Sequence, residues 1–207
     1  MSDNINKLSN KQINIYVILV SLYCSMLIVS NIISNRTFEL GQFMLPSAVI
    51  VFPLVYIIND ILTECFGFKM ASRAILTAFC LNLLSVLFFS IAINLPTTID
   101  YSSYNIVLGN TLKPLFASAM AYLVGSLVNA KVMDALKTHK SLMFRCILST
   151  LLGESLDAAI FISIMFIGVM DINVVVSMII TQAVVKTVYE IIVYPITRKA
   201  INVVKAS

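Results

Sequence analysis

Ionisable side chains inside otherwise apolar stretches are the residues of this chain best suited to do chemistry. They form three pairs, each spaced by three or four residues: Asp60 and Glu64, Glu154 and Asp157, and Lys186 and Glu190. Side chains at that spacing share one face of a helix. Carboxylates held on such a face inside an apolar environment can accept hydrogen bonds from a polar ligand, or take up and release protons.

The acidic groups in these stretches outnumber the basic ones. Five carboxyl groups against one lysine leave four uncompensated negative charges if all of them ionise. A low-dielectric interior does not hold that charge, so carboxyl groups must be protonated, hydrated, or matched by a cationic or donor-rich ligand. Two purely structural alternatives stay open: Lys186 can pair with Glu190 on its own helix, and Glu64 can reach towards Lys69 or Arg73.

The composition indicates that these residues sit in a membrane protein. The chain has 207 residues, of which 59% are hydrophobic and 12% charged, with a mean hydropathy of +0.96. An ordinary globular domain is about 45–50% apolar and about 25% charged. These values exclude a disordered tail and a nucleic-acid-binding module. Uncharged stretches of 24, 20, 26 and 17 residues cover 12–35, 40–59, 74–99 and 114–130, and a spanning helix needs about 20 residues.

The sequence predicts an all-α, polytopic membrane protein that forms one domain over residues 1–207. Six transmembrane helices are expected near 13–34, 46–67, 73–95, 112–135, 143–169 and 173–197, with a possible 3+3 inverted repeat. The segment Asn35–Pro46, which contains Gly41, is expected on the outer side and can dip back into the membrane as a hairpin. Pro53 and Pro195 are expected to kink the second and sixth helices. At about 1.5 Å per residue, the charged side chains other than Glu64 lie about 12–18 Å deep in a core about 30 Å thick.

The basic residues predict the orientation in the membrane. Eleven lysines and arginines flank the helices on the side of the termini, and two, Arg36 and Lys113, lie on the other side. The positive-inside rule then places both termini in the cytoplasm.

Several other kinds of site are disfavoured. The four cysteines show no CxxC spacing, so we expect buried free thiols. A proton-coupled metal carrier is disfavoured, because the single histidine, His139, lies in a basic loop and the sequence shows no clustering of cysteine with acids, so no metal site is expected. No GxxxxGK[ST] motif is present, so the chain itself is not expected to hydrolyse ATP. An intramembrane aspartyl enzyme using Asp60 and Asp157 is disfavoured because glycine-flanked aspartates are absent. We therefore expect no enzyme activity and no cofactor.

Five blocks of the chain resemble the YhhQ-type queuosine precursor transporters, also called the putative vitamin uptake transporter family. They are the SN pair Ser30–Asn31, Phe52–Ala74 (FPLVYIINDILTECFGFKMASRA), Gly125–Lys131 (GSLVNAK), Arg145–Phe161 (RCILSTLLGESLDAAIF) and Gln182–Pro195 (QAVVKTVYEIIVYP). The departures are Cys65, where the family commonly has an aliphatic residue, and Ile58–Asn59, which replaces a threonine-containing pair.

The resemblance implies uptake of 7-deazaguanine compounds, the precursors of queuosine in tRNA, across the cytoplasmic membrane. A carboxylate can accept both N1–H and the exocyclic amine of such a base. Asp157 is the first choice, with Glu154 or Asp60 second. The remaining candidates are the carbonyl donors Lys186, Gln182 and Asn31, the stacking residues Tyr56 and Phe161, and the proton-coupling residues Asp60 and Glu190.

The expected partners are the substrate and the lipid bilayer, with no nucleic acid. A homodimer is possible through the small residues of the fourth helix. The alternative function is a substrate-capture subunit that a separate ATPase energises.

Overall fold

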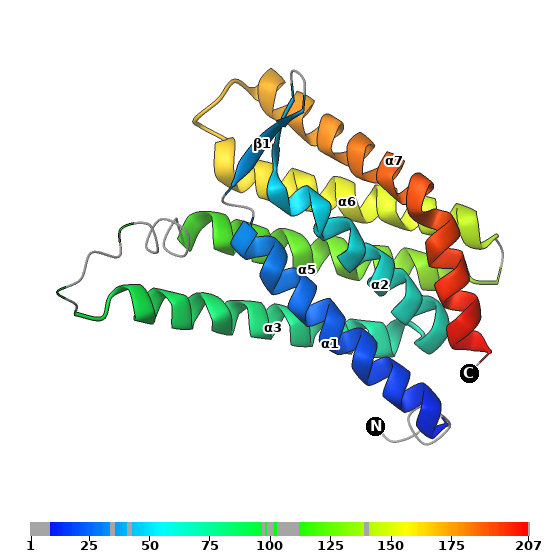
Figure 1. Ribbon diagram of the computed structural model, residues 1–207. Helices are drawn as coiled ribbons and strands as arrows, with labels where there is room; N and C mark the ends of the chain where they lie inside the picture. Colours follow the sequence, from blue (N-terminus) through cyan, green and yellow to red (C-terminus); the bar gives the residue numbers. More distant parts are fainter. Residues whose placement is uncertain are drawn as a thin grey trace.

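Six α-helices carry the fold of the described residues, so the predicted all-α class is confirmed (Figure 1). The computed structural model describes residues 9–33, 36–40, 43–96, 98, 102, 112–138 and 141–206. The α-helices are α1 (Asn10–Ile33), α2 (Phe52–Phe66), α3 (Phe68–Ile93), α5 (Leu112–Ala135), α6 (Leu142–Phe166) and α7 (Ile172–Lys205). Strands β1 (Thr37–Leu40) and β2 (Phe43–Pro46) pair antiparallel before α2, within the segment predicted to form a hairpin; its predicted return into the membrane stays a prediction.

Five of the helices, α1, α3, α5, α6 and α7, are long and apolar enough to cross a membrane. The prediction of six such helices is not confirmed, because α2 has 15 residues. At about 1.5 Å per residue it is about 22 Å long, against a hydrocarbon core of about 30 Å. The expected helix near 46–67 is divided into the end of β2, a 3₁₀ turn at Ser47–Ile50 and then α2.

Proline explains where α2 begins. Pro53 lies in the first turn of α2, where its missing N–H would have no partner within the helix. It therefore starts this helix instead of kinking a longer one, as the sequence had suggested. At the other end, Gly67 adopts a φ of 80°, which permits the sharp turn into α3.

Helix α7 is longer than expected. It has 34 residues and continues past the predicted end at 197, with Pro195 inside it. Ile201 in this extension is buried and packs with Ile57 and Ile61 of α2. Tertiary packing therefore continues the helix beyond the proline, and Arg198 and Lys199 lie on the helix itself.

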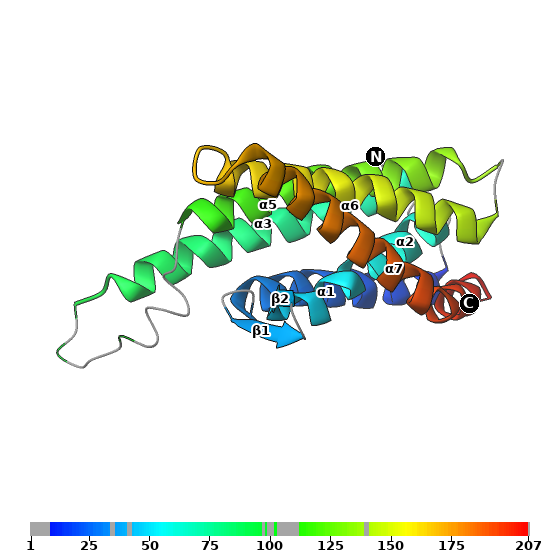
Figure 2. The same ribbon diagram turned by 90° about the horizontal axis from the view of Figure 1, so that it is seen from above.

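Helix α2 occupies the centre of the bundle and contacts α1, α3, α5 and α7 (Figures 1 and 2). Helix α5 packs against α6, and α6 packs against α7. The polar residues of α2 can therefore meet side chains from several other helices. The described helices do not establish the 3+3 inverted repeat.

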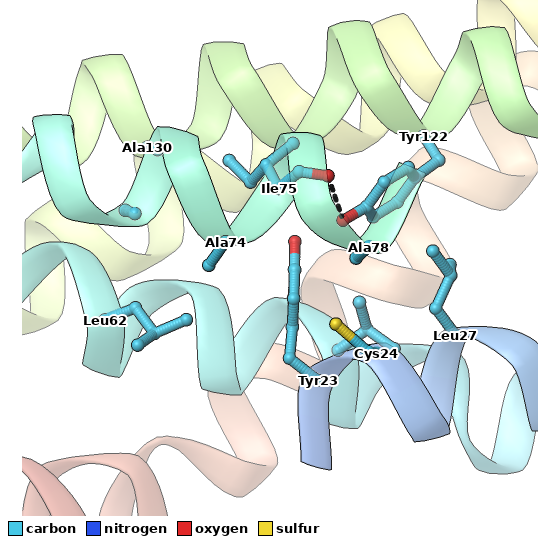
Figure 3. Packing of buried hydrophobic residues seen from close by; sticks show 11 residues of the cluster. Tyr23, Cys24, Leu27, Leu62, Ala74, Ile75, Ala78, Tyr122 and Ala130 are labelled. Atoms are coloured by element: carbon cyan, nitrogen blue, oxygen red, sulfur yellow. Dashed lines mark hydrogen bonds between the residues drawn. The ribbon is translucent and has the colours of Figure 1, made fainter. Parts of the chain in front are cut away.

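One apolar cluster joins α1, α2, α3 and α5 (Figure 3). Tyr23, Leu27, Leu62 and Ile75 are fully buried in it, and the Tyr122 hydroxyl donates to the Ile75 carbonyl at 3.4 Å. Large apolar side chains also cover the outside of the long helices, among them Phe88, 59% exposed. An apolar exterior around an apolar core is what a lipid-embedded bundle requires.

Helices α5 and α6 approach closely where two glycines face each other. A Cβ atom placed on Gly153 would lie 2.8 Å from the Gly125 carbonyl oxygen and 2.8 Å from the Asn129 Cβ. The small residues of α5, including Ala121, Ser126 and Ala130, are buried within the chain. Small side chains that let backbones approach are a common basis of helix packing in membranes.

We predict that Gly153→Ala destabilises the folded protein by about 1–3 kcal/mol, because the backbone oxygen of Gly125 cannot move out of the way of the added methyl group. The midpoint of thermal unfolding in detergent measures this effect. The neighbouring Leu152→Ala is the control, since Leu152 is 42% exposed. Equal unfolding temperatures for Gly153→Ala and the unmodified chain would contradict the close packing.

Candidate functional site

A partly buried lysine from α7 binds two buried carboxylates from α6. The Lys186 Nζ donates to Asp157 Oδ2 at 2.9 Å and also to Glu154 Oε2. Glu154 is 1% and Asp157 6% exposed. The alternative pairing of Lys186 with Glu190 is not among the ion pairs of the described residues. Lys186 therefore crosses between helices and joins α7 to α6.

Aromatic residues of α2 lie beside this lysine. The Lys186 Nζ is 4.7 Å from the centroid of the Phe52 ring, a distance that allows a cation–π interaction. The rings of Phe52 and Tyr56 are 5.7 Å apart. A Cβ atom on Gly125 would lie 2.8 Å from the Tyr56 hydroxyl and 2.9 Å from the Asp157 Cβ, so the hydroxyl lies close to Asp157. We call Phe52, Tyr56, Glu154, Asp157 and Lys186 the lysine site.

The lysine site retains capacity to bind a polar ligand. With both carboxyl groups ionised it carries one net negative charge, since a single ammonium group faces two carboxylates. The Tyr56 hydroxyl is buried and has no hydrogen-bond partner among the described residues. Buried polar groups in folded proteins are normally paired. An unpaired hydroxyl next to an excess of acceptors suits a ligand that brings its own donors.

A second charged cluster closes one end of the bundle around Glu64. Arg145 of α6 donates through both terminal nitrogens, with Nη2 at 3.2 Å from Glu64 Oε1. Lys205 of α7 donates to the same carboxylate, and the Lys137 Nζ donates to the Glu64 backbone carbonyl at 2.8 Å. The expectation that Glu64 reaches Lys69 or Arg73 is wrong. These two residues follow Glu64 along the chain, but its partners come from α6 and α7.

Asp60, Cys146 and Glu190 form a third cluster, here called the acid–thiol cluster. One potential ligand atom from each lies within 4.8 Å of the others, and all three residues are buried. Both Asp60 oxygens and one Glu190 oxygen have no hydrogen-bond partner among the described residues. The statement that cysteine and acids do not cluster is therefore wrong. Sequence spacing could not show the contact, because the three residues lie on three helices.

The other predicted site residues lie in different surroundings. Asn31 donates to Asn82 Oδ1 at 2.8 Å and accepts from the Ser118 hydroxyl at 3.0 Å, which ties α1 to α3 and α5. Phe161 packs against the apolar cluster of Ala158, Ile162 and Val175 between α6 and α7. Gln182 is half-buried, one helical turn from Lys186.

Sequence reasoning missed a polar connection between α2, α5 and α6. Asn59 donates to the Ser126 carbonyl and to Asn129 Oδ1, both at 3.1 Å. Asn129 in turn lies 3.5 Å from the Ser149 hydroxyl and 3.4 Å from the Thr150 hydroxyl. The sequence offered one signal for this network, namely that Asn59 and Asn129 are polar residues inside apolar stretches.

Comparison with known families gives one match. Residues 46–200 match a family model described as "Putative vitamin uptake transporter". That range contains the whole lysine site and the whole acid–thiol cluster. No curated protein and no solved structure gives a significant match.

We predict that Lys186→Met destabilises the protein by about 3–5 kcal/mol, because Glu154 and Asp157 lose their counter-ion while they stay buried. Thermal unfolding in detergent measures the loss, and Lys199→Met, at an exposed position of α7, is the control. Adding Glu154→Gln and Asp157→Asn to Lys186→Met should restore most of the stability. If Lys186→Met were as stable as Lys199→Met, the buried ion pairs would be disproved.

Proposed function

Because the chain belongs to the putative vitamin uptake transporter family, we propose that it carries 7-deazaguanine precursors of queuosine across the cytoplasmic membrane. The family and five long apolar helices make it a multi-pass membrane protein of a transporter family. The observation that supports the substrate class is the lysine site. It combines two buried carboxylates, one ammonium group, an unpaired hydroxyl and an aromatic ring.

The chemistry of the lysine site matches the edge of a 7-deazaguanine. The N1–H and the exocyclic amine are adjacent donors, which Asp157 accepts with its two oxygens. Glu154 is the second acceptor and keeps Lys186 nearby. When the base displaces the ammonium group from Asp157, Lys186 is free to donate to the ring carbonyl oxygen. Asp157 and Lys186 thereby each keep a hydrogen-bond partner when the base is bound.

The net charge of the lysine site favours a cationic substrate. An aminomethyl precursor brings one positive charge, which balances the negative charge left by two carboxylates and one lysine. A nitrile precursor, which lacks that charge, gains no such compensation. The aromatic candidates for stacking on the base are Tyr56 and Phe161. Gln182, one helical turn from Lys186, is a further donor for the ring carbonyl, whereas the amide of Asn31 is engaged by Asn82 and Ser118.

The topology proposed from the basic residues places both termini in the cytoplasm. Helix α2 and the hairpin before it then replace a sixth full-length span, and the 3+3 division pairs α1–α3 with α5–α7. Asp60 and Glu190 are the proposed proton carriers of a secondary transporter, since they are buried carboxyl groups without a cationic partner in the described structure.

We predict that Asp157→Asn lowers uptake of a 7-deazaguanine precursor at least about thirty-fold, because a neutral amide cannot replace the charged acceptor. Uptake is measured as queuosine restored in the tRNA of cells that depend on salvage. Asp171→Asn is the matched control, since Asp171 is exposed at the start of α7 and its side chain caps no N–H. Uptake by Asp157→Asn equal to that of Asp171→Asn would exclude this carboxylate as the acceptor.

The energy source has a separate test. A proton uncoupler should abolish uptake into membrane vesicles that contain the purified chain alone, because the proposed coupling ion is the proton. Uptake that persists without a gradient would indicate facilitated diffusion. Uptake that requires ATP and a separate ATPase would support the alternative, a substrate-capture subunit.

A further inference from the structure

We propose that the acid–thiol cluster of Asp60, Cys146 and Glu190 is a binding site for a divalent transition-metal ion of the Zn²⁺ type. The cluster brings together donors from α2, α6 and α7, whose ligand atoms lie within 4.8 Å of one another. It is distinct from the lysine site, which uses Glu154, Asp157 and Lys186.

The unpaired oxygen atoms point to a ligand. Asp60 is 0% and Glu190 2% exposed, yet both Asp60 oxygens and Oε1 of Glu190 have no hydrogen bond from the described residues. A buried acceptor without a partner costs about 1–3 kcal/mol, and more when it is charged. Two such carboxyl groups facing one another need a cation or protons between them.

The basic side chains closest to the cluster along α6 and α7 already bind other acids. Arg145 precedes Cys146 along α6, but its guanidinium binds Glu64 through two nitrogens. Lys186 lies one turn before Glu190 on α7, but its ammonium group binds Glu154 and Asp157. Neither is paired with Asp60 or Glu190, so no basic side chain of the described residues compensates these two acids.

The donor set selects the class of ion. Zn²⁺ takes thiolate sulfur at about 2.3 Å and carboxylate oxygen at about 2.0–2.2 Å, so ligand atoms less than about 4.8 Å apart can share one ion after small shifts. Sodium, magnesium and calcium prefer oxygen ligands alone. On binding, the Cys146 S–H bond breaks, a sulfur–metal bond forms, and the proton leaves to solvent. A water molecule completes the coordination.

The metal and the proposed coupling protons would compete for the same atoms. Both occupy the carboxyl oxygens of Asp60 and Glu190, so acid should weaken metal binding. Metal binding itself does not depend on the transported substrate. Only its effect on transport depends on the proposed function.

Cobalt(II) titration of the purified full-length chain tests this site, because thiolate coordination produces a charge-transfer absorption band. We expect a saturable band at one Co²⁺ per chain, which Zn²⁺ displaces. Cys146→Ser should abolish the band, whereas Cys80→Ser, which changes an exposed free thiol, should keep it. Asp60→Asn should weaken Co²⁺ binding at least about tenfold.

Absence of Co²⁺ binding to the unmodified chain, or a band that survives in Cys146→Ser, would overturn the proposal. Circular dichroism checks the folding of each variant. If Cys146→Ser does not fold, Glu190→Gln with the thiol intact takes its place, and an unchanged Co²⁺ affinity would equally overturn the site. Loss of substrate uptake in the presence of Zn²⁺ is recorded separately. If the metal binds but uptake is unchanged, the metal site is supported and its link to transport is disproved.

Discussion

The structure depends on the rule that charge buried in an apolar bundle must be compensated by another charge. Lys186 meets that requirement for two acids at once, because its ammonium group contacts both Glu154 and Asp157. This contact fixes the rotation of α6 and α7 relative to each other. It also holds two carboxylates where a ligand with two adjacent donors can reach them. The same interaction therefore supports the packing of the bundle and the proposed recognition of the substrate.

Helix α2 arranges the polar residues in three successive levels. Tyr56, Asp60 and Glu64 are spaced by four residues, so their levels are separated by about 6 Å each. The first level along α2 is Tyr56 with Asp157 and Lys186. The second level is Asp60 with Cys146 and Glu190. The third and outermost level is Glu64 with Arg145 and Lys205. In the outermost level both carboxylate oxygens of Glu64 are paired with basic side chains, which closes this end of the bundle. The middle level is left without counter-ions, between the lysine site and that closed end.

Much of this could be predicted from the sequence, because membrane insertion imposes long apolar stretches and helical periodicity identifies shared faces. The stripe of Tyr56, Asp60 and Glu64 and the pair Glu154 and Asp157 follow from spacing alone. The length of α2 could not be read from hydropathy, since a 3₁₀ turn is as apolar as a helix.

The pairing between helices also lay beyond the sequence. The partners of Glu64 and the contact of Cys146 with Asp60 depend on how three helices rotate and approach. The spacing of residues along one helix contains no information on how neighbouring helices are rotated or how closely they approach. The close approach of α5 and α6 at Gly125 and Gly153 contributes to this pairing, because it lets α6 bring its acids to α2.

Equilibrium binding to the purified chain tests the central claim most directly, when a 7-deazaguanine base is compared with the matching 7-deazahypoxanthine. The two bases differ by the exocyclic amine alone. Since Asp157 is proposed to accept from that amine, its removal leaves a buried carboxylate oxygen without a donor, and affinity should fall about tenfold or more. Equal affinities for the two bases would contradict recognition by the lysine site.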